Sequence, residues 1–454
     1  MTLIETVQDT NVEEQGVVMT SADLDLAQST QLGYGTRNVV EVSLNIVNAT
    51  VGAGVIGLPF ALALAGFAPG LVLSIIVGIM TTGAIYSMIV CGLKVGVYSF
   101  AGLAEYTMGQ FGFYTLNFML FIQSAGSCIS YFILVADTLP VLLSIYVPQY
   151  PILGDRQLMT ILISVIVIFP FNVFRSIGTL ARWSAFAVFL LPIMVLTVLI
   201  RAPFYAGQHD VPLWSIGRDP VAATGMMSFA FVCSQVAFSN YLSQRNQSLN
   251  AWSKTSAFST ALSWAISISF AIVGYLSFGV DADANIFSCF PMDDHVINLG
   301  RLALGLSMIL TVPMAFYPAR DAIQKTLGLE TAHRQPTNFQ HYSMTVILFT
   351  MFLAIGVNIR SLGKVYSVVG GIASSFLAYI IPGYSYLKIF RPFKSVGTPA
   401  HPSELVPFAK PLTIQEENLA KEDLSMSWML SVNSTVLMLF GSMVMALTAI
   451  SAFK

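Results

Sequence analysis

The sequence predicts an all-α membrane protein with eleven transmembrane helices, and three observations lead to that prediction. Hydrophobic residues make up 55% of the 454 residues and charged residues only 10%, against roughly 25% charged residues in soluble domains. The mean hydropathy is +0.73. Apolar runs of roughly 20 residues, the length that crosses a bilayer, recur along almost the whole chain. The predicted spans are 39–66, 70–95, 113–143, 157–172, 182–201, 220–242, 253–278, 296–319, 342–358, 362–389 and 426–453.

Three segments outside the spans complete the predicted layout. Residues 1–38 hold six acids and one base, Arg37, and are predicted to be a disordered acidic tail in the cytosol. Residues 98–112 are predicted to form a short amphipathic helix on the cytosolic side. Residues 390–425, which contain six prolines or glycines, are predicted to be a long cytosolic loop before the last span.

The distribution of basic residues predicts the orientation. With the N-terminus in the cytosol, fourteen of the 21 lysines and arginines lie on the cytosolic side and seven on the other. This agrees with the positive-inside rule, and the inverse orientation does not. An odd number of spans then places the C-terminus outside the cell or in an organelle lumen.

The chain lacks the residue patterns of several functional classes. Its cysteines, Cys91, Cys128, Cys233 and Cys289, form no CxxC pair, and no acid, base or histidine lies at the centre of a span. This disfavours redox chemistry, metalloprotease chemistry and a proton relay at mid-membrane depth. No basic stripe indicates nucleic-acid binding. We therefore expect a net-neutral solute whose charges are met by helix ends and a small cation.

Residues 45–60, NIVNATVGAGVIGLPF, carry glycines with the spacing of a dinucleotide-binding loop, Gly52-x-Gly54-x-x-Gly57. Such a loop follows a strand, opens a helix and needs an acid about 20 residues further on. Here the flanks are bilayer-length apolar runs, and the next acid is Glu105. The pattern therefore does not predict a dinucleotide site.

Two interpretations of these glycines remain. They either allow close packing of helices, or they interrupt a membrane helix and free backbone groups to bind a substrate or an ion. Pro59 follows directly, and Asn45, Asn48 and Thr50 place polar groups at the same depth. These neighbours favour an interrupted helix.

Four other spans carry polar residues near mid-membrane. Any one set alone is better explained as a contact between helices, but their convergence favours a polar cavity. The sets are Gln123, Ser127 and either Ser130 or Tyr131 in the third span, Gly225, Ser228, Ser234 and Gln235 in the sixth, Ser307 and Thr311 ahead of Pro313 in the eighth, and Gly370, Gly371, Ser374 and Ser375 in the tenth.

The motif N-x-x-N-A-x-x-G-x-G-x-x-G-L-P, residues 45–59, resembles the first span of the amino acid/auxin permease family. That family includes the sodium-coupled neutral amino acid transporters and the fungal vacuolar amino acid transporters. The resemblance covers residues 39–453 and continues through ADTLP, FPFNVFRSIGTLARWS, MSFAFVC, ILTVPMAFYPAR and IIPGYSYLK. It implies a LeuT-like fold of two inverted five-helix repeats, 39–201 and 220–389, with the helix 426–453 appended. It also implies that the first and sixth spans are the interrupted pair.

The resemblance implies a substrate site at the two interruptions. The backbone from Val51 to Val55 would hold the carboxylate of an amino acid, and residues 228–234 would lie near its amino group. Gln123 and Ser127 would border its side chain. The expected substrate-binding residues are Asn48, Val51, Gly52, Ala53, Gly54, Gln123, Ser127, Ser228, Phe231 and Ser234.

The resemblance also implies a cation site between the first and eighth spans. In sodium-coupled relatives, the second asparagine of the motif and the threonine before the eighth-span proline help to hold the cation, and these match Asn48 and Thr311. The expected cation-binding residues are Asn48, Val51, Ser307 and Thr311. The coupling ion is Na⁺ or H⁺, because vacuolar members are often treated as proton-coupled.

One departure limits what the resemblance transfers. Many vacuolar relatives carry a histidine pair after the sixth-span cysteine, whereas this chain continues Cys233-Ser234-Gln235. The substrate range, and any pH dependence due to those histidines, are therefore not carried over.

We interpret the chain as a cation-coupled secondary transporter of amino acids that works by alternating access. Neutral amino acids are favoured because no buried charge is available to pair with a charged side chain. One alternative is an amino acid sensor with little flux, and another is a channel, although channels need pores lined by polar or charged rings. We expect no enzyme activity and no cofactor, and no nucleic-acid or obligate protein partner. A vacuole-like membrane is favoured over the plasma membrane, and the oligomeric state stays open.

Overall fold

The computed structural model describes residues 32–33, 35–174, 177–330, 335–390 and 427–452. Within these residues the secondary structure is helical, and one isolated β-bridge joins Arg37 to Gln244. Residues 1–31 of the predicted tail and residues 391–425 of the predicted loop lie outside the described residues. The described end of the predicted tail, residues 35–38, is not free, because its backbone is bonded to residues 243–245.

The described helices agree with the predicted spans to within several residues. In chain order they are α2 (Val39–Thr50), α3 (Leu58–Ala65), α4 (Phe67–Val95), α5 (Phe100–Tyr146), α6 (Arg156–Ile163), α7 (Phe169–Val173), α8 (Ile177–Arg201), α9 (Pro220–Phe231), α10 (Ala237–Ser243), α11 (Leu249–Phe278), α12 (His295–Thr326), α13 (Asn338–Asn358), α14 (Leu362–Val369), α15 (Ile381–Phe390) and α17 (Trp428–Ala452).

The described residues form nine or ten helical stretches that can span a membrane. Nine helical stretches of the described chain are long and apolar enough to cross a bilayer, and ten if α2 and α3, bent by 56°, count as one. The chain is therefore a multi-pass membrane protein. The predicted span 182–201 falls on α8, which is not among the nine. The count of eleven and the two inverted repeats stay predictions.

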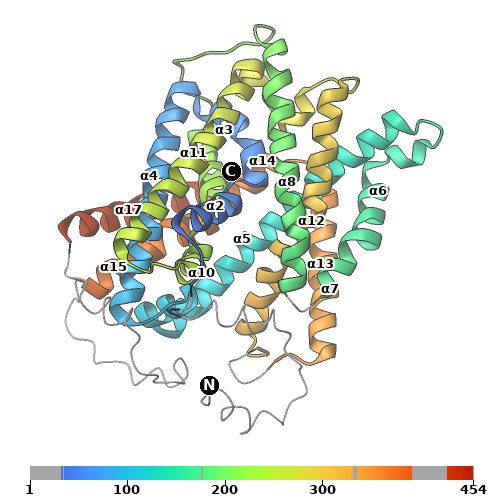
Figure 1. Cartoon of the computed structure of the whole chain (residues 1–454). Coiled ribbons are helices and arrows are strands. Elements are labelled where there is room, and N and C mark those ends of the chain that lie inside the picture. The colour runs from blue at the N-terminus through green and yellow to red at the C-terminus, as the bar shows by residue number, and fades with distance from the viewer. Residues whose placement is uncertain (1–31, 34, 175–176, 331–334, 391–426, 453–454) are drawn as a thin grey trace, which may run out of the picture.

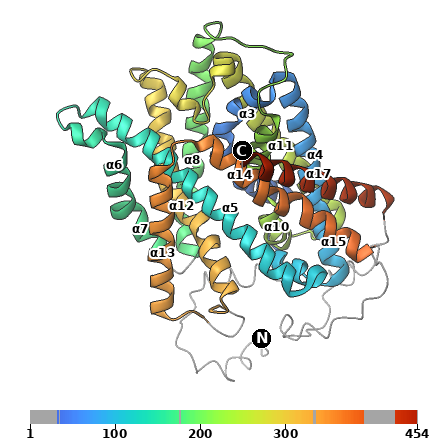
Figure 2. The same ribbon diagram turned by 180° about the vertical axis from the view of Figure 1, so that it is seen from behind.

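Figures 1 and 2 show how the helices are arranged in space. Helices α5 and α12 pack along each other and α12 also packs on α8. Helices α4, α15 and α17 lie together on one side of this group, and α6, α7 and α13 lie on the other (Figures 1 and 2). Helices α2, α3 and α11 lie between the two sides (Figures 1 and 2), and α9 packs on α3, so both interrupted spans are central.

The predicted helix 98–112 and the third span form one element with a sharp kink. Helix α5 runs from Phe100 to Tyr146, but Gly109 has φ 67° and ψ −158°. Glycine reaches this conformation far more readily than residues with a side chain. The boundary between the short helix and the span is therefore Gly109, three residues earlier than predicted.

A cluster around Asp294 ties two helix ends together on the predicted outer side. The Asp294 carboxylate caps α12 by accepting the Val296 and Ile297 N–H groups at 3.1 and 3.2 Å. It also accepts the Arg201 Nε–H at 2.7 Å and the Tyr205 hydroxyl at 3.3 Å. The end of α8 is thereby joined to the start of α12.

We expect stability to fall at low pH because of Asp294. Burial opposes its ionised form, but the hydrogen bonds from Arg201 and Ile297 outweigh this and hold its pKa below the usual value. A carboxyl with a depressed pKa stabilises the fold above its unfolded pKa of about 3.9, and this contribution is lost as the pH falls through the folded value. Thermal melts of wild type and Asp294→Asn should therefore differ at pH 5–7 and converge as the pH falls through the depressed pKa of Asp294.

This variant keeps an N-capping side chain, because asparagine caps helices about as well as aspartate, so the expected loss comes from the charged hydrogen bond with Arg201. Asp155→Asn, at the exposed N-cap of α6, is the matched control and should change the melting temperature less. Equal melting temperatures for wild type and Asp294→Asn at neutral pH would contradict the role given to Asp294.

Candidate functional site

The first predicted interruption is confirmed. Helix α2 ends at Thr50, and the Gly52 N–H then bonds to the Thr50 carbonyl at 3.0 Å instead of continuing the i→i−4 pattern. A short 3₁₀ helix, Ala53–Gly57, follows and leads directly into α3. The first N–H groups of a helix have no acceptor within it. The amides of Ala53 and Gly54 therefore open on the interruption.

The second interruption lies where the resemblance implied it, in the sixth span. Helix α9 ends at Phe231, and Val232 turns to an extended conformation with φ −66° and ψ 122°. A three-residue 3₁₀ turn, Ser234–Val236, then leads into α10. The last carbonyls of α9 are left without the amide partners that a continuous helix would supply.

The two interrupted spans meet where Gly54 of the first faces Ala230 of the sixth. A methyl group on Gly54 would come within 2.8 Å of the Ala230 Cα, so the two backbones touch there. A methyl group on Gly57 would meet Met226 and Tyr366 at 3.0 Å, whereas one on Gly52 would meet no atom within 4 Å. The glycines therefore serve close packing at Gly54 and Gly57, and the interruption opens on free space at Gly52.

Two hydrogen bonds connect predicted substrate residues to the tenth span. The Ser374 hydroxyl donates to Gln123 Oε1 at 2.6 Å, and the Tyr379 hydroxyl donates to Ser228 Oγ at 3.2 Å. The tenth span carries both partners on two π-helical segments, Gly370–Ser374 and Phe376–Ile380. Such segments occur often at functional sites.

The other predicted substrate residues differ in their surroundings. Val51, Phe231 and Ser234 are buried, and the Ser234 Oγ is a buried atom with no hydrogen-bond partner among the described residues. Ser127 is half-buried and bonds to the Gln123 carbonyl of its own helix at 3.0 Å. Asn48 is exposed on α2, and of Ala53 only the backbone is described.

The four predicted cation residues lie on helices with different neighbours. Helix α2, which carries Asn48, packs chiefly on α11, whereas α12, which carries Ser307 and Thr311, packs on α5 and α8. The Thr311 hydroxyl bonds to the Ser307 carbonyl at 2.7 Å, and the Ser307 hydroxyl reaches the Ala187 carbonyl at 3.5 Å. The cation site therefore stays a prediction.

Sequence reasoning missed two tyrosines of the tenth span. Tyr379 bonds to Ser228, and the Tyr366 ring lies 4.8 Å from the ring of Phe229 beside Gly57. Both tyrosines are buried. A buried tyrosine usually needs a partner for its hydroxyl. Tyrosines in the same apolar span as Gly370 and Gly371 could therefore have indicated polar contacts of the tenth span with the site.

None of the four ion pairs found among the described residues includes a predicted site residue. The Arg156 Nε–H bonds to Asp137 at 2.9 Å at the predicted outer ends of the third and fourth spans. The described residues contain no group of three or more His, Cys, Asp or Glu that could hold a metal ion. The described side chains of the candidate site are uncharged.

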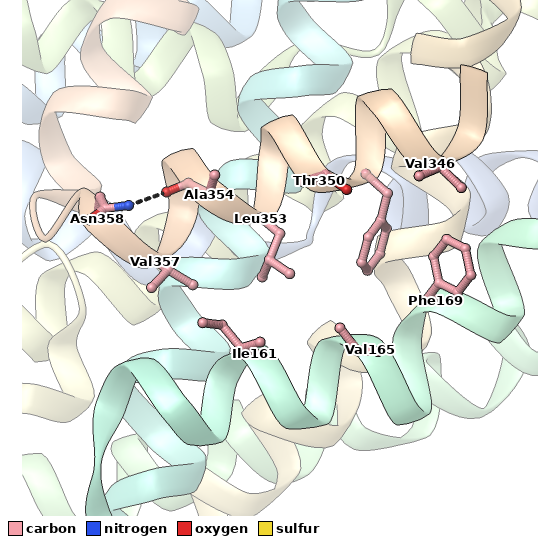
Figure 3. A pocket seen from close by; sticks show the side chains of 10 residues that line it. Ile161, Val165, Phe169, Val346, Thr350, Leu353, Ala354, Val357 and Asn358 are labelled. Atoms are coloured by element: carbon pink, nitrogen blue, oxygen red, sulfur yellow. Dashed lines mark hydrogen bonds between the residues drawn. The ribbon is translucent and has the colours of Figure 1, made fainter. Parts of the chain in front are cut away.

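A groove of about 510 Å³ lies elsewhere, between α6–α7 and α13. Figure 3 shows Ile161 and Val165 facing Leu353 and Val357 across it, with Asn358 at one end. Its lining is almost entirely apolar, and it contains none of the predicted site residues. It does not coincide with the interrupted spans.

Comparisons with known proteins agree with this arrangement. The model of the family "Transmembrane amino acid transporter protein" matches residues 35–408. The "Putative sodium-coupled neutral amino acid transporter 11" of Danio rerio is 28% identical over 362 residues, which cover 78% of this chain and 80% of that protein. The "Vacuolar amino acid transporter 2" of Saccharomyces cerevisiae is 28% identical over 372 residues, 78% of this chain and 76% of that one.

A solved structure shows a similar fold. The crystal structure of the Eremococcus coleocola manganese transporter superposes with a TM-score of 0.51 at 12% identity, and the match covers 97% of this chain and 91% of that chain. At this identity the likeness concerns the fold alone.

The fold and the site define a multi-pass membrane protein built around two interrupted helices. The chain belongs to the transmembrane amino acid transporter family. Its named relatives are transporters and not enzymes, which confirms both the resemblance and the expected absence of enzyme activity.

Proposed function

We propose that this protein moves neutral amino acids across a membrane by cation-coupled alternating access. The observation that carries the proposal is the meeting of two interrupted spans at Gly54 and Ala230, where the 3₁₀ amides opening α3 lie beside the end of α9. Freed amides suit a carboxylate and freed carbonyls suit an ammonium group. A zwitterion presents both groups to one site.

The uncharged surroundings support a neutral side chain on the substrate. Gln123, Ser228 and Ser234 are buried and polar, and none carries a charge. A charged substrate side chain would need a buried partner, because an unpaired charge in the membrane is costly. The relative from Danio rerio, whose name includes neutral amino acids, agrees with this choice.

The cation is proposed to bind between α2 and α12, with Na⁺ as the first candidate. Asn48, Ser307 and Thr311 supply amide and hydroxyl oxygens, and the Val51 carbonyl lies at the interruption. Oxygen ligands of this kind suit hard cations. We also propose that the N-terminus lies in the cytosol, which the distribution of basic residues supports. A vacuole-like membrane is proposed as the location, and the name of the yeast relative supports it.

Uptake by the purified protein in liposomes tests the proposal. Labelled neutral, acidic and basic amino acids are offered with an imposed Na⁺ gradient or an imposed H⁺ gradient, in separate experiments. We expect accumulation of neutral amino acids driven by Na⁺ and lost when the gradient is dissipated. Accumulation driven only by H⁺ would remove Na⁺ from the proposal, and uptake equal to that of empty liposomes would overturn transport.

A further inference from the structure

A short segment ahead of α2 is bonded to the loop that follows α10. The Arg37 N–H donates to the Ser243 carbonyl at 3.0 Å, and the Arg245 N–H donates to the Arg37 carbonyl at 2.7 Å. These two bonds form the parallel bridge between Arg37 and Gln244. We call Gly33 and residues 35–38 the strap, and residues 242–247 the inner loop.

The strap fits the inner loop closely because it contains glycine. A methyl group on Gly35 would lie 2.2 Å from the Gln244 carbonyl oxygen and 2.7 Å from the Leu242 carbonyl oxygen. No real Cβ approaches backbone atoms this closely, so a side chain at this position would push the strap away. The Gly33 N–H adds a bond to Gln247 Oε1 at 3.0 Å.

The inner loop is itself held by buried amide side chains. Gln244 Nε2 donates to the Asn246 carbonyl at 2.8 Å, and Gln244 Oε1 accepts the Thr255 hydroxyl of α11 at 3.0 Å. Gln247 Nε2 donates to the Leu242 carbonyl at 2.7 Å. Both glutamines are buried, and a buried amide left unbonded is costly. The loop therefore offers the strap a fixed surface.

The strap is also fixed to α2. The Asn38 side chain and the Glu41 side chain form a reciprocal capping box at the start of the helix. Further along, Asn45 Nδ2 donates to Asn240 Oδ1 of α10 at 2.7 Å. Helix α2 is thus joined to α10 at its start through the strap and further along through this side-chain pair.

We propose that the strap makes α2 and α10, the inner halves of the two interrupted spans, move as one body. Gly35 and Gln247 are then positioning residues. They lie outside the proposed substrate site, and their role is to keep α2 in register with α10. The inference deepens the proposed function, because it assigns the unit that moves during alternating access.

Distance measurements between the two helices test the inference without relying on flux. Nitroxide labels on the exposed residues Leu44 of α2 and Ser239 of α10, in a Cys289→Ser background, report the separation by pulsed electron paramagnetic resonance. Cys91, Cys128 and Cys233 are buried and are not expected to label. We expect one narrow distance, unchanged with or without Na⁺ and an amino acid mixture. Two distances that exchange with ligand in the wild type would overturn the inference.

Gly35→Val and Thr36→Val form a matched pair of variants. Both place valine in the strap, but the side chain of Thr36 is exposed, whereas a side chain at position 35 would collide with the inner loop. Gly35→Val should broaden the distance and speed amide hydrogen exchange in residues 36–46 and 241–248 together, while Thr36→Val should match the wild type. Gly35→Val with wild-type distances and exchange would contradict the strap.

Uptake separates this inference from the proposed function. Gly35→Val should lower amino acid uptake more than fivefold relative to Thr36→Val at equal reconstituted protein. If the wild type itself shows no uptake, the proposed function fails, and the distance and exchange measurements still decide whether the strap joins α2 to α10.

Discussion

Gly54→Ala is expected to lower amino acid uptake about tenfold to a hundredfold. The added methyl group would lie 2.8 Å from the Ala230 Cα and 3.1 Å from its Cβ, and it would force the interrupted spans apart. Overpacking of this kind costs about 1–3 kcal/mol, and each 1.4 kcal/mol is about tenfold in an equilibrium constant. The strain falls where the substrate carboxylate and amino group are proposed to bind, so uptake is the quantity most affected.

Gly78→Ala is the matched control for this variant. Gly78 also lies in a membrane helix, but a methyl group there would lie 3.4 Å from its nearest neighbour, Trp264 Cδ1, an ordinary contact. Initial rates of uptake per amount of reconstituted protein, with melting temperatures measured in detergent, separate lost transport from lost folding. Wild-type rates for Gly54→Ala would show that the contact at Ala230 is not part of the transport site.

Thr311→Ala is expected to raise the Na⁺ concentration for half-maximal uptake about tenfold, with a smaller effect on maximal uptake. The substitution removes one proposed cation ligand. Losing an interaction about as strong as one hydrogen bond, about 1.4 kcal/mol, weakens Na⁺ binding about tenfold. The measurement is the Na⁺ dependence of uptake at saturating amino acid.

Thr326→Ala is the control for Thr311→Ala. Both threonines lie on α12, and both hydroxyls donate to the carbonyl four residues earlier at 2.7 Å. Thr326 is at the end of the helix, away from the predicted cation residues. Equal shifts for both variants would mean that Thr311 acts through helix stability, and unchanged Na⁺ dependence for Thr311→Ala would remove this residue from the cation site.

Much of the fold follows from the sequence because the bilayer allows few alternatives. Apolar runs must be helical where lipid surrounds them, and the described helices agree with the predicted spans to within several residues. The interruption after Thr50 was also predictable, because Gly52 and Gly54 combine with polar neighbours at mid-span. Asn48 and Thr50 on an apolar helix indicated that backbone groups would be freed there.

Contacts between distant segments could not be predicted in the same way. The π-helical segments of the tenth span, and the bond of Tyr379 to Ser228 151 residues away, depend on how the helices pack. Arg37, which forms the bridge to Gln244, lies in a segment whose acidic composition predicted only a solvated tail. Composition describes an average over a segment, whereas pairing depends on single residues such as Gly35.

Electron microscopy of the wild-type protein with a saturating amino acid, chosen from the uptake experiments, shows directly where the substrate binds. We expect density between the interruptions, with the carboxylate against the amides of residues 52–54 and the amino group near the end of α9. Density for the amino acid at a different position, or none there at a concentration that saturates uptake, would contradict this expectation.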